Sequence, residues 1–230
     1  MNDRRNTGWL NAFLPGRRFD SMTSANPIES AAIVLYEGFD ELDAIGPYEV
    51  FQNAAEAGAD LDVALCTLEP ADRVTASHGL VIEPDAAFDD LAADPDLVVV
   101  PGGGWNDGAE HGARAEVERG GLPDAIAERY RNGAAVASVC TGGMILAAAG
   151  VLDGRPATTH HGAIDDLYET AAEVIDARVV DDDDVLTAGG VTSGIDLALW
   201  LVERDLGTDT ADTVAREMEY ERRGEVYRAD

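Results

Sequence analysis

The stretch that decides the fold is AVASVCTGGMILAAAG, residues 135–150. It consists of a short apolar run, one cysteine, two glycines and then an alanine-rich apolar run long enough for about two helical turns. This order predicts a buried parallel strand that leads directly into a helix. Cys140 would lie at the turn between the two, where the glycines prevent crowding.

The position of Cys140 has a chemical consequence. In an open α/β sheet, ligands bind beyond the carboxyl ends of the strands, and a helix N-terminus at that edge stabilises negative charge. We therefore expect the thiol to face a cleft and to have a lowered pKa and raised reactivity. The alternative is that Cys140 is a small buried residue that packs in a tight turn.

A second stretch with chemical content is DLVVVPGGGW, residues 96–105. The three valines predict a buried strand, and the glycines after it leave backbone N–H groups free to face a ligand. Gly102 and Gly103 are therefore candidates for an oxyanion hole. An ordinary glycine-rich turn is the alternative, and Trp105 either lines the pocket mouth or simply packs beside the loop.

The remaining sequence alternates between strand-like and helix-like patterns. Strands are expected at 31–36, 61–68, 96–100, 135–139, 157–161, 174–180 and 185–188, with a short hairpin at 74–82. Helices are expected after residue 41 up to a stop at Gly58, at 122–131, from 142, at 164–172, from about 195 and at 210–220. This alternation predicts a single α/β domain: a doubly wound, mostly parallel sheet with helices on both faces.

The charge of the chain is strongly negative. Its 45 acidic residues face 16 basic ones, all of them arginine, for a formal net charge of −29. A partner with many phosphates needs a basic face, so we expect no binding to nucleic acid or to an anionic membrane. A dense acidic surface without lysine is typical of a protein that stays dissolved in a high-salt cytoplasm, which indicates a halophilic source.

The ends of the chain and its cysteines complete this outline. Residues 1–27 carry more arginine than acid, and we expect a poorly ordered leader, with Met22 as an alternative start, before a domain at 28–230. Cys66 and Cys140 lie on different predicted strands, which favours free thiols in a reducing cytosol. No run reaches the ~18 apolar residues of a membrane helix.

Five motifs in this order resemble the ThiJ/PfpI superfamily, whose fold is related to that of class I glutamine amidotransferases. The similarity runs from about residue 31 to residue 220 and is greatest to the branch that contains isonitrile hydratase and the ligand-like domains of AraC-type regulators. The motifs are LDAIGPYEVF (42–51), VPGG (100–103), SVCTG (138–142), ATTH (157–160) and TAGGVTSGID (187–196).

The resemblance implies a role for each matching position. Cys140 matches the nucleophile, and Asp43 matches the acidic residue held against that thiol. Backbone N–H groups near Gly103 and Thr141 match the oxyanion donors. Thr141 also matches a threonine of the hydratase, where peptidase-like members have histidine. His160 matches a histidine near the site whose role varies, and homodimers are usual in the superfamily.

These roles are chemically consistent with each other. A carboxylic acid beside a thiolate shares one proton with it, so Asp43 should have a raised pKa. Attack of Cys140 on an isonitrile carbon, with protonation by Asp43, gives a thioimidate, which water converts to an N-substituted formamide. Thr141 would orient the water or the acid. The alternative for Asp43 is a helix cap or a surface carboxylate.

Two other function classes stay open. A sensor or stress protein would use a reactive Cys140 without turnover, and glyoxalase or deglycase chemistry would use it on another small molecule. We expect no cofactor and no metal. His160 and His161 should point to opposite faces of a strand, residues 181–184 lack the ligand spacing of a calcium loop, and Asp196 should favour a helix N-terminus.

Overall fold

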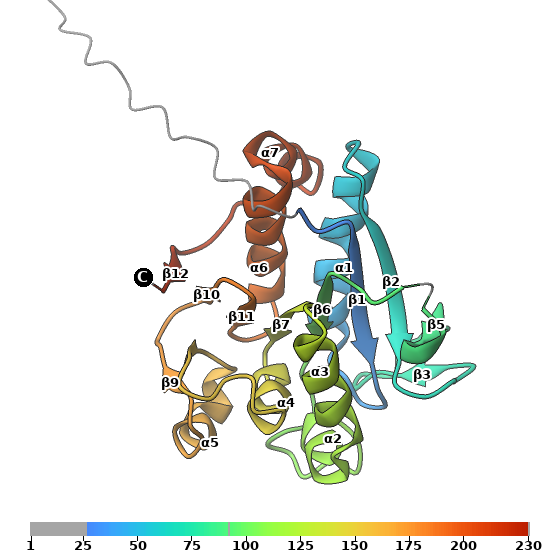
Figure 1. Ribbon diagram of the computed structural model, residues 1–230, viewed down its shortest axis with the longest axis vertical. Coiled ribbons are helices and arrows are strands. Elements are labelled where there is room, and N and C mark those ends of the chain that lie inside the picture. Colours follow the sequence, from blue (N-terminus) through green and yellow to red (C-terminus); the bar gives the residue numbers. More distant parts are fainter. Residues whose placement is uncertain (1–26, 92, 230) are drawn as a thin grey trace, which may run out of the picture.

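The computed structural model of the chain describes residues 27–229 except residue 92 (Figure 1). Apart from Pro27, the leader expected at residues 1–27 lies outside the described residues, as does the alternative start at Met22.

One eight-stranded sheet forms the centre of the fold. Its strand order is β12-β10-β11-β7-β6-β1-β2-β5, and all neighbouring pairs are parallel except β10 and β11, which are antiparallel. The strands are β1 Ser30–Leu35, β2 Asp62–Thr67, β5 Ala86–Ala87, β6 Leu97–Val100, β7 Ala135–Val139, β10 Val179–Asp182, β11 Val185–Ala188 and β12 Val226–Arg228.

Two small sheets lie outside it. The strands β3 (Val74–Thr75) and β4 (Val81–Ile82) form the expected antiparallel hairpin. The strands β8 (Pro156–Ala157) and β9 (Glu173–Val174) pair in parallel.

The helices fall into two groups that cover the sheet (Figure 1). Helices α1, α6 and α7 contact one another and the strands β1, β2, β10 and β11, whereas α2, α3 and α4 contact one another and the strands β6 and β7. The helices are α1 Glu41–Glu56, α2 Ala113–Arg119, α3 Gly121–Arg131, α4 Gly142–Ala148, α5 Ile164–Tyr168, α6 Ser193–Leu201 and α7 Thr208–Glu217. The predicted doubly wound α/β fold is confirmed.

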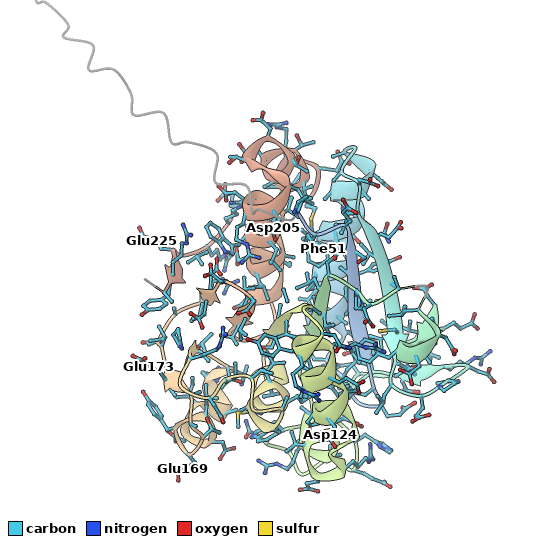
Figure 2. All side chains as sticks on the ribbon, viewed as in Figure 1. Phe51, Asp124, Glu169, Glu173, Asp205 and Glu225 are labelled. Atoms are coloured by element: carbon cyan, nitrogen blue, oxygen red, sulfur yellow. The ribbon has the colours of Figure 1, made fainter. Side chains whose placement is uncertain are left out.

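The core lies between the sheet and these helices. All four residues of β6 and all but the first residue of β1 and of β7 are buried, as their continuous runs of apolar residues require. Figure 2 shows Phe51 of α1 inside the molecule, where it is fully buried. Burial of one such side chain stabilises the fold by about 1.5–3 kcal/mol.

The main differences from the expected elements lie between β7 and β11. The strand expected at 157–161 ends at Ala157, and a short 3-10 turn, His161–Ala163, follows it. The strand expected at 174–180 is two strands, β9 and β10, in different sheets. Helix α5 ends at Tyr168. Outside this region, helix α2 and the edge strands β5 and β12 were not predicted.

The parallel strands bring the candidate residues to one edge of the sheet. Strands β1, β6, β7 and β11 are neighbours and run in the same direction, so their carboxyl ends lie side by side. The loops that follow them contain the acid, glycine-rich, cysteine and TAGGVTSGID motifs. The candidate site is therefore built where an open α/β sheet places its ligands.

Candidate functional site

The nucleophile candidate lies in a sharply bent turn. Cys140 follows β7 directly with a φ of 57°, in the left-handed region that L-residues rarely adopt, and α4 begins two residues later. A Cβ on Gly142 would lie 2.1 Å from the carbonyl oxygen of Val100, so only glycine fits there. The turn is thus pressed against the end of β6, and Cys140 keeps 7% of its surface exposed.

The acid candidate faces this turn from α1. Asp43 lies in the first turn of the helix and is completely buried. Its Oδ2 accepts a hydrogen bond of 3.0 Å from Gly102 N–H. Its Oδ1 is buried and has no hydrogen-bond partner in the described part of the chain. Because a buried oxygen without a partner is costly, this atom is the expected place for a proton.

Asp43 and Cys140 lie close enough for each to shift the pKa of the other. Burial, together with the negative charge of Asp40, raises the pKa of Asp43 to about 7, which is the predicted direction, although Cys140 itself lowers this pKa. Burial and the Asp43 carboxylate raise the pKa of Cys140 to about 12. Between pH values of about 7 and about 12 the pair therefore holds one proton on the two groups together.

The predicted lowering of the Cys140 pKa is wrong for this structure. Loss of water around the sulfur is the largest effect, and the Asp43 charge acts in the same direction. The backbone N–H groups of Thr141 and Val191 do lower the pKa, but by less. A helix of seven residues adds only a small dipole, which burial outweighs.

The glycine-rich loop holds the site together. Gly102 N–H binds Asp43, and Gly103 N–H donates to Thr141 Oγ1 at 2.9 Å. Both N–H groups proposed for an oxyanion hole therefore already have acceptors in this structure. A Cβ on Gly102 would lie 2.4 Å from Thr141 N, so the loop also packs directly on the cysteine turn.

His160 lies at the edge of the site on the loop after β8. Its Nδ1 accepts a hydrogen bond of 3.1 Å from Gly162 N–H, and burial and the neighbouring His161 lower the pKa of its ring. The rings of His160 and His161 are 4.1 Å apart. The expectation that they point to opposite faces is wrong, because the strand ends before them.

Three residues of this site were missed at the sequence level. Tyr36 O–H donates to the carbonyl oxygen of Pro101 at 2.6 Å, and Thr159 Oγ1 donates to that of Cys140 at 2.8 Å. Val191 has a φ of 40°. A polar residue directly after a buried strand was an available signal for Tyr36, but nothing in the sequence marks a valine for a left-handed backbone.

Other polar residues have structural roles. Trp105 donates to Asp166 at 2.6 Å and carries the Arg114 guanidinium over its ring. Asp196, in the first turn of α6, accepts from Arg178 and Tyr220. Asp181 accepts from Trp200 and Arg204.

Within residues 27–91 and 93–229, one partly exposed group of side chains could hold a metal ion. Among the described residues, Asp40, Glu41 and His78 are the one set of three whose possible ligand atoms lie within 4.8 Å of one another. Glu41 and His78 already form an ion pair. In the described ranges no helix is long and apolar enough to cross a membrane.

Comparisons with known proteins show which family the chain resembles. The sequence model of the DJ-1/PfpI family matches residues 29–204. An isonitrile hydratase of Pseudomonas putida is 37% identical over 187 residues, which cover 81% of this chain and 76% of the relative. A deglycase of Thermococcus kodakarensis is 34% identical over 152 residues, 65% of this chain and 83% of the relative.

A solved structure supports the same assignment. The crystal structure of a ThiJ/PfpI family protein from Pseudomonas syringae superposes with a TM-score of 0.73 at 28% identity. The match covers 94% of this chain and 83% of that one.

Proposed function

Because the chain belongs to the DJ-1/PfpI family, we propose that it is an enzyme that hydrates isonitriles to N-substituted formamides. Cys140 is the nucleophile and Asp43 the general acid and base. The observation that carries this proposal is the buried pair itself, in which Asp43 and Cys140 lie close enough to shift each other's pKa and the Oδ1 atom of Asp43 has no hydrogen-bond partner among the described residues. The substrate is a small molecule, and the enzyme acts in the cytoplasm as a homodimer.

The first half of the reaction moves the shared proton. The Asp43 carboxylate takes the Cys140 proton as the sulfur attacks the isonitrile carbon, and it then delivers this proton to that carbon. A carbon–sulfur bond forms and a thioimidate results. A group with a pKa of about 7 suits this role, since it both holds and releases a proton near neutral pH.

The second half regenerates the thiol. The Asp43 carboxylate takes a proton from a water molecule that attacks the thioimidate carbon and passes it to the substrate nitrogen. The carbon–sulfur bond then breaks, the proton of the new hydroxyl group passes through Asp43 to the Cys140 sulfur, and the N-substituted formamide leaves. Thr141, whose hydroxyl oxygen is held by Gly103 N–H, orients the water, and the N–H groups of Thr141 and Val191 stabilise negative charge on sulfur.

The pair disfavours a redox sensor. Oxidation of cysteine needs the thiolate, and a thiol whose pKa is raised to about 12 is a poor thiolate source without a substrate. Deglycase chemistry is the second candidate, because the relative from Thermococcus kodakarensis carries that name. Both activities would use the same cysteine, so the substrate must distinguish them.

The test is formamide formation from a panel of small isonitriles in multimolar salt, with a glycated amino acid assayed in parallel. Cys140→Ala and Asp43→Asn should each abolish turnover. Cys66→Ala is the matched control, because Cys66 is also a buried free cysteine but lies on β2 away from the pair. Release of sugar without formamide would favour the deglycase, and an active Asp43→Asn variant would refute the acid role.

A further inference from the structure

We propose that His160 is a positioning residue whose ring holds the strained Gly190–Val191 peptide against Cys140, and that it exchanges no proton with the substrate. The inference rests on the proposed function, since it assigns a task to a residue of the same site. It also assigns a role to the backbone of Val191, which the sequence did not mark.

Two strained turns lie next to each other at this edge of the sheet. Cys140 follows β7 with a φ of 57°, and Val191 lies three residues after the end of the neighbouring strand β11 with a φ of 40°. A left-handed backbone is costly for any residue with a Cβ, and for a β-branched valine it is a genuine outlier. Cys140 N–H donates to the carbonyl oxygen of Gly189 at 2.8 Å, which ties the two turns together.

The His160 ring lies directly on the second turn. A Cβ placed on Gly190 would lie 2.6 Å from Cδ2 and 3.2 Å from Nε2 of His160. No side chain fits between the ring and this backbone. Because strained conformations persist only where the surroundings fix them, the ring is well placed to keep Val191 in its left-handed conformation.

The other ring nitrogen of His160 is already occupied. Nδ1 accepts from Gly162 N–H at 3.1 Å, so it carries no hydrogen in this arrangement, and the ring hydrogen is on Nε2. Burial and the neighbouring His161 lower the pKa of the ring. A ring fixed in one tautomer by its own turn is suited to packing rather than to carrying protons.

The residue before His160 acts on the first turn. Thr159 Oγ1 donates to the carbonyl oxygen of Cys140 at 2.8 Å, and the Thr159 side chain would be 3.2 Å from a Cβ on Gly143. Thr159 thus holds the backbone of Cys140, and His160 holds the turn that contains Val191. The result is that the N–H of Val191 stays close to the sulfur when charge develops there.

The experiment compares variants that separate ring packing from proton transfer. His160→Ala removes the ring and should lower kcat on the order of 100-fold, as displacement of reacting groups does, with little change in KM. His160→Phe keeps a ring over Gly190 without nitrogens and should retain most of the activity. Equal losses in both variants would overturn the positioning role.

A rescue variant provides the second arm. Glycine adopts positive φ without strain, so Val191→Gly added to His160→Ala should restore part of kcat. A proton-carrying histidine would allow no such rescue. Circular dichroism and the unfolding midpoint of each variant exclude simple loss of the fold as the cause.

The third arm does not depend on isonitrile turnover. In a Cys66→Ala background, the rate at which iodoacetamide alkylates Cys140 is followed against pH by intact mass. His160→Ala should shift this profile to higher pH, and His160→Phe should leave it in place. If the alkylation profile shifts in His160→Ala but the parent protein has no isonitrile activity, the proposed reaction is refuted and the positioning role of His160 stands. If the profile of His160→Ala is unchanged, the positioning role is overturned.

Discussion

The proton shared by Asp43 and Cys140 determines how activity depends on pH. The reactive form holds one proton on the pair, so kcat/KM should rise with pH as the first proton leaves, with a midpoint near the Asp43 pKa of about 7. It should stay level above that pH until the second proton is lost near 12. Initial rates from pH 5 to 10 at constant salt would show this, and a falling limb through pH 7 would contradict it.

The same carboxyl group makes stability depend on pH. Its pKa is 3.8 in an ordinary setting and about 7 here, so between these values the folded chain binds more protons at this site than the unfolded chain. The free energy of unfolding is therefore highest, as far as this group is concerned, below pH 3.8, and it falls as pH rises towards 7. By pH 8 this group has lowered the free energy of unfolding by roughly 4 kcal/mol.

Asp43→Asn tests that contribution, because asparagine has the same shape and does not titrate. The difference in unfolding free energy between the variant and the parent should move in favour of the variant as pH rises from 4 to 8. Urea unfolding at matched salt measures it. Replacing an exposed acid such as Glu169 should give a difference that stays flat over the same range.

Asp43, Cys140 and the two loop glycines show which properties of the site can be predicted from the sequence. The motif order and the chemistry of a carboxylic acid beside a thiol predicted the direction of the Asp43 pKa shift but not its cause, since burial and Asp40 raise this pKa whereas Cys140 lowers it. The direction for Cys140 was missed, because the helix N-terminus can be read from the sequence whereas the exclusion of water from the sulfur cannot. The acceptors of the Gly102 and Gly103 N–H groups were missed for a similar reason, since they depend on how three loops meet.

At the level of the elements, a substitution at the contact between β6 and α4 should cause a large loss of stability. A methyl group on Gly142 would meet the carbonyl oxygen of Val100 at 2.1 Å, which is backbone and cannot turn away. Gly142→Ala should therefore displace the cysteine turn and lower stability by about 1–3 kcal/mol, the usual range for overpacking. Activity should fall with it.

Gly121→Ala is the matched control. This glycine begins α3, and its added Cβ would meet only the end of the flexible Leu68 side chain, at 3.3 Å. Thermal unfolding and isonitrile turnover of both variants would show whether the contact at Gly142 is specific. Similar behaviour of the two variants would mean that α4 can shift without cost.

Elements were predictable where the apolar pattern alone determines them. The valine-rich run of β6 and the alternation of strands and helices led to the correct central sheet. The segment at 157–163 was not predictable, because its short strand β8 pairs with β9 outside the main sheet. Helix α2, only seven residues long, gave too short a periodic signal.

At the scale of the whole molecule, the acidic charge lies mainly on exposed side chains among the described residues. Figure 2 shows Asp124, Glu169, Glu173 and Glu225 pointing outward, and all four are exposed. Arginines bind acids within the fold: Arg204, for example, pairs with the buried Asp181 and Asp205. The net charge of −29 therefore falls mainly on the surface, where like charges repel.

Salt should stabilise the protein by screening this repulsion, since the Debye length falls from about 10 Å at 0.1 M to about 3 Å at 1 M. We expect Tm to rise steadily with KCl over this range. Differential scanning calorimetry measures it, with sucrose at equal osmolality as the control for general compaction. A Tm that falls with KCl, or that rises equally in sucrose, would contradict the charge argument.

The loop from Asn106 to Glu110 differs from the rest of the site in one respect. It continues from the glycine-rich loop and is exposed throughout, whereas the Asp43–Cys140 pair is fixed by backbone contacts that tolerate no side chain at Gly102 or Gly142. Selection can thus alter the loop freely while the chemistry stays intact.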